Sequence, residues 1–370
     1  MHKKISIYIH IPFCKSKCNY CTFNSYPLKI FSKELISHYF KFLKNQILQY
    51  KDLLQERKII SIYFGGGTPS VVEDRYIHEI LNTICKNYNI LEECEITIEI
   101  NPETVNHEKL KNFKEYGINR ISIGIQSFND NLLKFLGRIH SSKQAIKSIE
   151  TAKRIFKNVS IDLMYGIPYQ NIKILEDDLK KAVSFDVEHI SCYCLSIEEN
   201  SILAKKGIKE ISDNTFNKMY DYLVNFLNKN NYIQYEISNF SKKGYESKHN
   251  LNYWNYGEYI GFGAGAFSFF NNKRWKNKSF PEDFIKNPDI PEFQENIDKK
   301  TMEFEYIFLN LRKTDGIDLD EYRRRFRKNF IIEYRKILQR YKEYFIINRH
   351  SVRLNLNGFK ISNTIFSDFI

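Results

Sequence analysis

Three cysteines lie close together near the start of the chain, at Cys14, Cys18 and Cys21. Thiolates grouped this closely on one loop are typical of an iron–sulfur cluster, whereas a structural zinc site usually takes its ligands from two separated pairs. A [4Fe–4S] cube has four irons, so three thiolates leave one iron with an open coordination position for a further ligand. The spacing therefore predicts such a cluster, with structural zinc as the alternative.

A glycine-rich turn, Gly65-Gly-Gly-Thr-Pro69, follows a predicted strand at residues 59–64. Glycines let the backbone approach a ligand closely, and the Thr hydroxyl and exposed N–H groups can hold carboxylate or amine substituents. By itself, such a turn is equally compatible with a tight loop that binds nothing.

The elements that must position these residues alternate between strands and helices. We expect strands near residues 5–11, 59–64, 95–101, 120–127, 159–164 and 189–197, and helices near residues 32–54, 73–88, 141–156 and 174–185. An alternation of this rhythm indicates parallel βαβ units.

The predicted strands carry apolar and polar residues in strict alternation. In the first strand Ile5, Ile7, Ile9 and Ile11 oppose Ser6, Tyr8 and His10, and the strands at 95–101, 120–127 and 159–164 repeat the pattern. Because side chains alternate across a strand, the isoleucine face can pack on outer helices while the polar face lines an interior. The pattern predicts a barrel whose lumen holds a polar ligand.

Further motifs surround these features in the order found in one known group of proteins. They are Tyr8-Ile-His-Ile-Pro-Phe-Cys14, Phe64-Gly-Gly-Gly-Thr-Pro-Ser70, Glu99-Ile-Asn-Pro102, Asn119-Arg-Ile-Ser-Ile-Gly-Ile-Gln-Ser-Phe128, Leu136-Gly-Arg-Ile-His140, Ile161-Asp-Leu-Met-Tyr-Gly-Ile-Pro168, Tyr235-Glu-Ile-Ser-Asn-Phe240 and Gly261-Phe-Gly-Ala-Gly-Ala266. Together with the cysteine loop, they resemble the radical S-adenosylmethionine (SAM) superfamily and, within it, the oxygen-independent coproporphyrinogen III oxidase group.

The resemblance implies an α/β fold, with a partial (β/α)6 radical SAM barrel and a smaller C-terminal α+β domain. It places the barrel at residues 1–235, a connecting region at 236–300 and a helical, winged-type domain at 301–370. It also implies that Cys14, Cys18 and Cys21 hold a [4Fe–4S] cluster. The implied SAM contacts are Tyr8, Gly66, Gly67, Thr68, Glu99, Gln126, Arg138 and Asp162. Tyr8, Glu99, Gln126 and Asp162 lie on the polar strand faces predicted above.

Three features separate the oxidase from the heme chaperones of the same group. The oxidase pattern has a fourth cysteine where this chain has Phe23, and it carries an extension ahead of the cluster loop. The third feature, His249-Asn-Leu-Asn-Tyr-Trp254, resembles a heme-binding motif of the chaperones. Histidine is a usual axial ligand of heme iron. We therefore expect His249, flanked by Tyr253 and Trp254, to bind heme iron at the mouth of the lumen or on its C-terminal side.

Other histidines bear on this expectation. His140 or His189 would be the substitute ligand if His249 did not bind the iron. Relatives commonly have a second histidine at the position that Phe267 occupies here, so this chain cannot use a histidine at that position.

The resemblance leads to a heme chaperone that delivers heme to acceptor proteins, which can be membrane-bound. The enzyme alternative is oxidative decarboxylation of coproporphyrinogen III, started by a radical formed from reductively cleaved SAM and supplied by an electron donor. A homodimer is a further expectation.

The net charge of +12 is concentrated near the C-terminus. Residues 321–353 carry 11 Lys and Arg against 3 Glu, and their aromatic and aliphatic side chains recur as on one amphipathic helix: Phe326, Phe330, Tyr334, Ile337, Tyr341 and Phe345. The basic residues are expected to form a solvated face. The alternatives are a surface for an acidic partner, an anionic membrane or, as a separate class of function, nucleic acid.

The cysteine pattern also bears on location. Seven cysteines are an odd number without a disulfide framework, which favours a reducing cytoplasm, and Cys85, Cys94, Cys192 and Cys194 lack ligand spacing. No apolar run approaches the length of a membrane span, and we interpret the basic start of the chain as leading into a strand, not as a signal peptide.

Overall fold

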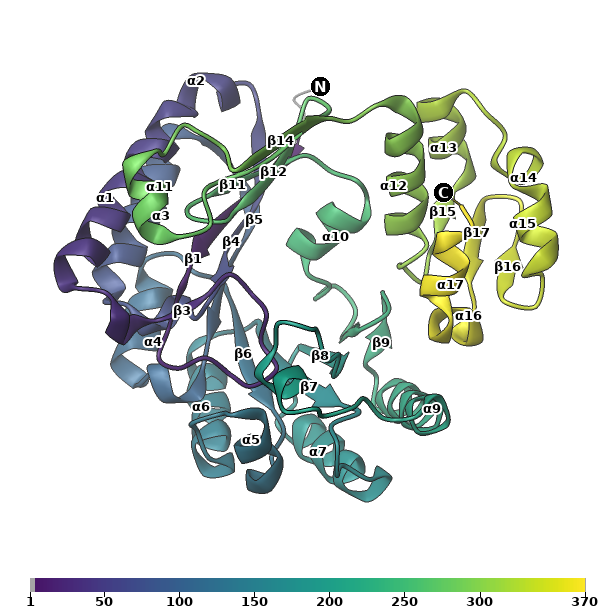
Figure 1. The fold of residues 1–370 in the computed structure, drawn as a ribbon, viewed down its shortest axis with the longest axis horizontal. Coiled ribbons are helices and arrows are strands. Elements are labelled where there is room, and N and C mark those ends of the chain that lie inside the picture. Colours follow the sequence, from purple (N-terminus) through teal and green to yellow (C-terminus); the bar gives the residue numbers. More distant parts are fainter. Residues whose placement is uncertain (1–3, 370) are drawn as a thin grey trace.

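The computed structural model describes residues 4–369 and contains one large curved sheet (Figure 1). Its centre is formed by six parallel strands: β1 (Lys4–Ile11), β4 (Lys58–Gly66), β5 (Asn89–Ile100), β6 (Arg120–Gln126), β7 (Val159–Tyr165) and β8 (His189–Cys194). The α/β fold with a mostly parallel sheet and all six predicted strands are thereby confirmed.

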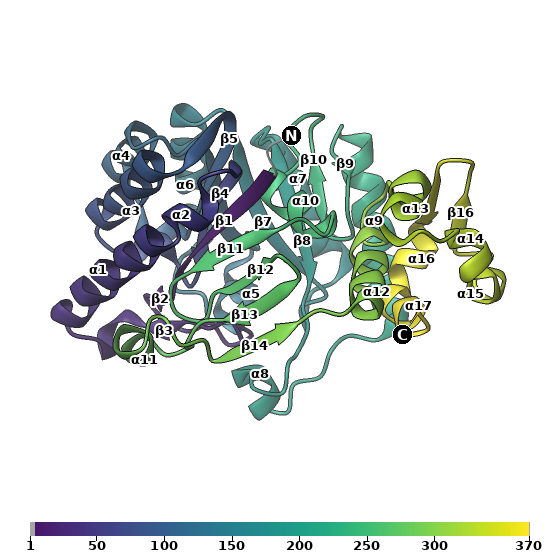
Figure 2. The ribbon, with the colours of Figure 1, turned by 90° about the horizontal axis from the view of Figure 1, so that it is seen from above.

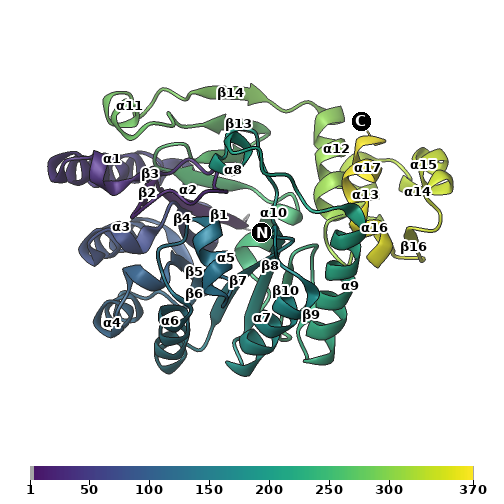
Figure 3. The same cartoon turned by 60° about the horizontal axis from the view of Figure 1, so that its bottom comes forward.

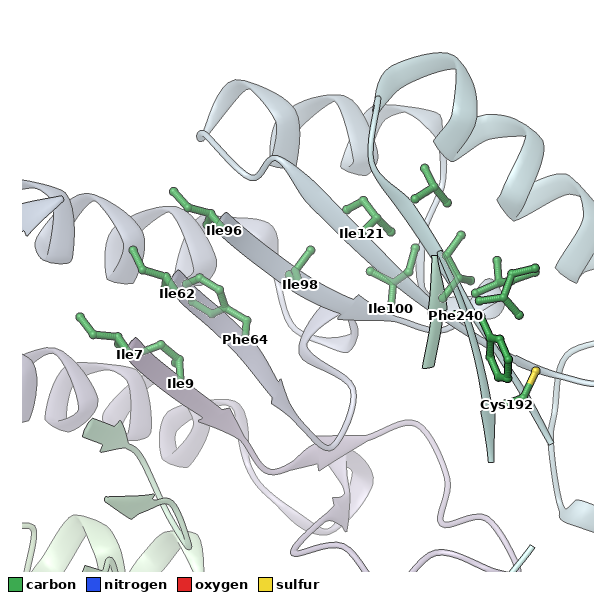
Figure 4. Packing of buried hydrophobic residues seen from close by; sticks show 14 of the residues in the cluster. Ile7, Ile9, Ile62, Phe64, Ile96, Ile98, Ile100, Ile121, Cys192 and Phe240 are labelled. Carbon is green, nitrogen blue, oxygen red and sulfur yellow. The ribbon is translucent and has the colours of Figure 1, made fainter. Parts of the chain in front are cut away.

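Helices cover the outer face of this sheet. They are α1 (Lys33–Gln49), the short α2 (Lys51–Leu54), α3 (Asp74–Asn87), α4 (His107–Glu115), α6 (Ser142–Ile155), α7 (Ile172–Ser184) and α9 (Asp213–Lys229). The short helices α5 (Asp130–Leu136) and α8 (Ile202–Lys205) instead pack together in a separate hydrophobic cluster. The isoleucine side chains of the strands point toward the outer helices and are buried (Figure 4). Each such side chain contributes about 1.5–3 kcal/mol through burial. The opposite, polar faces therefore surround a lumen.

The sheet continues beyond both edges of the six strands. β11 (Tyr259–Phe262) pairs with β1, and β12 (Phe267–Phe270), β13 (Lys273–Lys276) and β14 (Phe293–Asn296) follow it outward. At the other edge, β10 (Asn239–Ser241) and β9 (Ile233–Gln234) pair beside β8. The segment 236–300, predicted as a connecting region, supplies β10 to β14 to the large sheet. Its backbone N–H and C=O groups pair with the outer edges of β1 and β8, which would otherwise be unpaired.

Short elements complete this part of the fold. They are β2 (Phe13–Cys14), β3 (Tyr26–Pro27), the 3₁₀ turns at Leu28–Ile30, Pro69–Val71 and Pro102–Thr104, α10 (Lys248–Trp254) and α11 (Pro281–Lys286). Among these, α10 contacts β1 and β4 on the lumen side of the sheet (Figure 1). It lies opposite the outer helices and closes part of the lumen.

A smaller C-terminal domain lies beside α9 (Figures 2 and 3). It contains α12 (Lys299–Asn310), α13 (Leu319–Phe326), α14 (Phe330–Glu333), α15 (Arg335–Arg340), α16 (Leu356–Lys360), α17 (Ser362–Ser367) and an antiparallel sheet of β15 (Ile317–Asp318), β17 (Ser351–Leu354) and β16 (Phe345–Ile347). An ion pair of 2.6 Å between Lys360 and Asp221 joins it to α9.

The prediction of a single amphipathic helix in the basic segment 321–353 is wrong, because the segment contains the separate helices α13, α14 and α15. The helix α13 ends because Arg327 adopts a left-handed conformation, and Asn329 then caps a new helix by accepting hydrogen bonds from the next turn. Several basic side chains in this segment form ion pairs, among them Arg325 with Glu321 and Arg340 with Asp368. Within residues 4–369, no helix has the length and apolar character that crossing a bilayer requires.

Candidate functional site

The cysteine loop follows the carboxyl end of β1 and runs from β2 to β3, two short strands that pair with each other outside the large sheet. Lys17 lies across the loop, and its Nζ donates hydrogen bonds to the carbonyls of Phe23 at 2.6 Å and Ser25 at 3.1 Å. Asn19 fixes the loop to the end of α5 through a 2.8 Å bond from its Nδ2 to the carbonyl of Phe135. These contacts set the positions of the cysteines on either side.

The glycine-rich turn packs directly against the backbone of the cysteine loop. The Gly67 N–H donates to the carbonyl of Ile11, and the Thr68 N–H donates to that of Phe13, both at 2.8 Å. A Cβ on Gly67 would lie 2.6 Å from the Phe13 carbonyl oxygen, so only glycine permits this approach. The turn and the cysteine loop therefore form one wall.

That wall encloses a small cavity of about 130 Å³ at the carboxyl ends of the strands. All three loop cysteines line it, and so do seven of the eight residues expected to contact SAM: Gly66, Gly67, Thr68, Glu99, Gln126, Arg138 and Asp162. The eighth, Tyr8, lines the adjoining cavity described below. The structure thus brings together residues that are up to 148 positions apart (14 to 162) in the chain.

The polar groups of the small cavity are arranged around the sulfur atoms. Thr68 Oγ1 lies 3.6 Å from Cys14 Sγ, and Arg138 Nη1 lies 3.6 Å from Cys18 Sγ. Burial raises the pKa of both thiols, whereas the Arg138 guanidinium acts in the opposite direction on Cys18. The cation and the hydroxyl stabilise thiolates, which are the form that binds iron.

The donor set suits a cluster bound on one side. Among residues 4–369, no three His, Cys, Asp or Glu side chains converge as they would around a single metal ion, and the three thiols instead share the wall of the small cavity. Three sulfur donors from one loop, facing a cavity with cationic and hydroxyl groups, fit a [4Fe–4S] cube with one iron open to a second ligand.

Asn101 is a residue of this cavity that the sequence analysis did not single out. Its Nδ2 donates to Thr68 Oγ1 at 3.0 Å, and its Oδ1 accepts from Arg138 Nη2 at 2.7 Å. It therefore links the glycine-rich turn to the guanidinium beside Cys18. Its place in the Glu99–Pro102 motif, directly after β5, was the available signal.

Two half-buried carboxyl groups lie deeper in the lumen. Burial raises the pKa of Glu99 to about 7, although Tyr63 donates a 2.8 Å hydrogen bond to its Oε1. Burial also raises the pKa of Asp162, which accepts from Ser122 Oγ at 3.3 Å. Both groups can form hydrogen bonds with the hydroxyls of a polar ligand. Because the pKa of Glu99 is about 7, its side chain can take part near neutral pH either as the protonated acid or as the carboxylate.

A second, larger cavity of about 770 Å³ adjoins the first and shares Phe23, Gly66 and Glu99 with it. Its size falls within the roughly 300–1,000 Å³ typical of cofactor and ligand sites. Aromatic side chains form much of its wall, with two cations near them: Tyr8, Tyr253, Trp254, Tyr256, Tyr259, Phe267, Phe269, Phe308, Arg274 and Lys276. This lining suits a large planar ligand that carries acidic groups.

The helix α10 presents its last turn to this larger cavity. Glu95 on β5 holds the start of α10, because its carboxylate accepts hydrogen bonds from Ser247 Oγ and from the Lys248 and His249 N–H groups at 3.1–3.2 Å. The opposite end of α10 then places Tyr253 and Trp254 in the cavity wall.

His249 lies deeper than its two motif partners. Its side chain is 1 % exposed and is not part of the cavity wall. Nδ1 is 2.8 Å from Ser61 Oγ and Nε2 is 2.9 Å from the Tyr253 hydroxyl, while the ring stacks on Tyr63. Burial lowers its pKa to about 3. Both ring nitrogens therefore already have partners, and His249 could bind iron only after releasing one of them.

His189 and His140, the two alternative heme ligands, also have polar partners within the protein. His189 is bonded to Ser160 Oγ and the Tyr235 hydroxyl, each at 2.8 Å. His140 contacts the Ile125 carbonyl and the Glu103 carboxylate, each at 3.3 Å. Neither lines the larger cavity. The four cysteines outside the loop are free thiols.

Comparison with known proteins agrees with this geometry. The radical SAM superfamily matches residues 8–182. In structure, the chain is similar to the coproporphyrinogen III oxidase HemN of Escherichia coli, with a TM-score of 0.85, 18% identity, and coverage of 99% of this chain and 90% of that one. The family match and the fold together define a radical SAM protein.

Sequence similarity identifies the branch. The chain is 41% identical to the heme chaperone HemW of Buchnera aphidicola from Schizaphis graminum, covering 83% of this chain and 82% of the relative. It is 33% identical to the heme chaperone HemW of Bacillus subtilis, covering 99% of each. The chain belongs to the heme chaperone HemW family.

The raised pKa of Glu99 predicts a pH dependence of stability. Between about pH 4.5 and 7 the unfolded state has released the Glu99 proton while the folded state retains it, so stability falls as the pH rises through this window. Glu99→Gln removes this loss. Its stability relative to wild type should therefore increase between pH 5 and 8, by at most about 3 kcal/mol.

Urea unfolding at several pH values measures this difference. The exposed Glu199→Gln is the matched control and should show no such trend. A difference between Glu99→Gln and wild type that stays constant from pH 5 to 8 would contradict the assignment.

Proposed function

We propose that the protein is a heme chaperone that binds heme in the larger cavity and transfers it to acceptor proteins, on a scaffold that carries a [4Fe–4S] cluster and SAM in the smaller one. The observation that carries the proposal is the pair of adjoining cavities, of about 130 and 770 Å³, which share Phe23, Gly66 and Glu99. The similarity to heme chaperones HemW supports it.

The small cavity supplies the protein groups for cluster and SAM. Cys14, Cys18 and Cys21 would hold the cube, and the Gly66–Thr68 turn would lie along the methionine end of SAM. Glu99, Gln126, Arg138 and Asp162 would hold the rest of SAM, with Tyr8 at the boundary to the larger cavity. A reduced cluster of this kind can supply one electron to a ligand on its open iron.

The larger cavity has the chemistry that heme requires. Aromatic faces provide apolar contact for the porphyrin. Arg274 and Lys276 in the wall can bind its two carboxylates, and each is now paired with a glutamate, Arg274 with Glu305 at 2.6 Å and Lys276 with Glu292 at 2.9 Å. Trp254 also lines this cavity, and its buried Nε1 has no hydrogen-bond partner among the described residues.

Phe23 favours this function over coproporphyrinogen III oxidation. It occupies the position of the oxidase pattern's fourth cysteine, is 69 % exposed, and lines both cavities where they meet. An apolar ring there offers contact to a porphyrin and no thiol for redox chemistry.

The cellular setting follows from the surface and the thiols. Seven free cysteines suit the reducing cytoplasm. The basic C-terminal domain exposes Ile331 and Ile332 beside its arginines, which would allow peripheral contact with an anionic membrane and membrane-bound heme acceptors. An electron donor and a homodimer belong to this proposal as well, whereas nucleic acid is not an expected partner.

The cluster is tested through its ligands. Changing Cys18 to Ala removes one of three thiolates and should leave a protein that no longer holds roughly four irons per chain after anaerobic reconstitution. Iron and sulfide analysis with the absorption spectrum measures this. Cys85→Ala, an exposed cysteine outside the loop, is the control and should load normally. Full iron content in Cys18→Ala, or stoichiometric zinc in the wild type, would refute the cluster.

The chaperone function is tested by heme transfer. Cluster-loaded protein should bind one heme per chain and pass it to an apo heme protein, as followed by the change in Soret absorption. The same sample, given SAM and a strong reductant under anaerobic conditions, should form no protoporphyrinogen from coproporphyrinogen III. Robust turnover, or a failure to bind heme, would overturn the proposal.

A further inference from the structure

The larger cavity meets the solvent beside two phenylalanines. Among the described residues that line it, three are exposed, namely Thr22, Phe23 and Phe267, and the others are buried or half-buried. Thr22 and Phe23 belong to the cysteine loop, whereas Phe267 begins β12. The opening of the cavity therefore lies beside these side chains, and a ligand that enters or leaves passes them.

A third phenylalanine continues this border across the sheet. Phe267 is the cross-strand partner of Lys276 on β13, and Lys276 is the partner of Phe293 on β14. Residues directly opposite one another in neighbouring strands point to the same face, so Phe293 shares the face on which Phe267 and Lys276 line the cavity. Two strand spacings place the backbones of the two phenylalanines about 10 Å apart. Phe267 is 42 % exposed and Phe293 is 43 % exposed.

We call these three side chains the rim phenylalanines: Phe23, Phe267 and Phe293. The backbone around them is fixed, because Asn24 Nδ2 donates hydrogen bonds to the carbonyls of Ala264 at 3.1 Å and Ser279 at 2.9 Å. These two bonds tie the cysteine loop to the segments before β12 and after β13. The strand β14 is the last of the large sheet, so no further strand of that sheet covers its outer edge. The rings are thus held in place beside the opening.

The chemistry of this surface is apolar. Exposed apolar side chains are ordinary when they are scattered singly, whereas several aromatic rings beside one opening indicate a contact surface. The charges between the rings neutralise each other, because Lys276 Nζ pairs with Glu292 at 2.9 Å and lies 5.8 Å from the centre of the Phe267 ring. A partner would therefore be recognised here mainly through apolar contact.

We propose that the rim phenylalanines are the docking surface for the heme-acceptor protein, which binds there transiently while heme leaves the larger cavity. This inference rests on the proposed heme function and names the surface through which transfer takes place. An acceptor on this surface covers the opening of the cavity, so the heme passes from one apolar site to another without entering water.

The size of the surface favours a transient partner over a permanent second copy of the chain. The three rings together expose roughly 300 Å². A stable interface buries about 800 Å² on each partner. A permanent homodimer on this surface would also cover the opening of the cavity and block the exit of its ligand.

The test compares two routes by which heme leaves the cluster-loaded, full-length protein. Excess apomyoglobin traps heme that is released into water, and a heme b protein of the same organism, prepared without its heme, is the acceptor. Soret absorption follows both reactions. Wild type should load the acceptor faster than it releases heme to apomyoglobin, at a rate that rises with the acceptor concentration.

Phe293→Thr is the most informative variant, because it removes an exposed ring that does not line the cavity and keeps a strand-forming residue. It should bind heme and release it to apomyoglobin as wild type does. Its loading of the acceptor should be about tenfold slower, as expected when an aromatic contact residue is lost. Ile346→Thr, at an exposed position of β16 in the C-terminal domain, is the matched control and should load the acceptor at the wild-type rate.

Different outcomes separate the inference from the proposed function. Loading by Phe293→Thr at the wild-type rate, or by wild type no faster than release to apomyoglobin, would overturn the inference alone. A change of oligomeric state in Phe293→Thr, measured by analytical ultracentrifugation, would assign the rim phenylalanines to a homodimer and also overturn it. If wild type bound no heme, the proposed function would fail, and the docking surface with it. Circular dichroism and iron content confirm that each variant is folded and loaded.

Discussion

The polar lumen of the large sheet is the constraint on which the rest of the structure depends. Isoleucines on one strand face pack under the outer helices, so Ser6, Ser61, Glu95 and their neighbours must lie inside, away from water. Buried polar groups are tolerated only when they are hydrogen-bonded. The helix α10 provides many of those partners, and the two cavities provide space for ligands that supply the others. Core packing and ligand binding thus have a common origin in the alternating strands.

The position of α10 joins the two halves of the site. Its start is held by the Glu95 carboxylate, and its buried face completes the chain from Ser6 through Ser61 to His249. The same helix then delivers Tyr253 and Trp254 to the larger cavity. The motif residues therefore divide between two tasks: His249 belongs to the packed lumen, and the aromatic residues after it face the ligand. The proposed heme site would therefore be fixed by the large sheet through the contacts of α10 with β1 and β4.

Much of this arrangement could be predicted from the sequence, because it depends on local patterns. The alternation of strand-like and helical segments predicted the six strands, and the period-two pattern in four of them predicted their polar faces. The spacing of three and two residues between cysteines placed them on one loop. Most of what could not be predicted depends on contacts between distant segments. The pairing of β11 with β1 has no local signature, and neither do the hydrogen bonds that occupy both nitrogens of His249. In the basic segment, the left-handed Arg327 interrupts an otherwise helical pattern.

The central claim is that the two cavities hold SAM and heme at the same time. The most direct test adds heme to cluster-loaded protein carrying labelled SAM and measures both ligands on the protein after rapid gel filtration. The two cavities share only Phe23, Gly66 and Glu99 and otherwise have separate linings. We therefore expect one heme to bind per chain while the labelled SAM is retained. Release of one SAM for each heme bound would show that they compete for one site and would contradict the account.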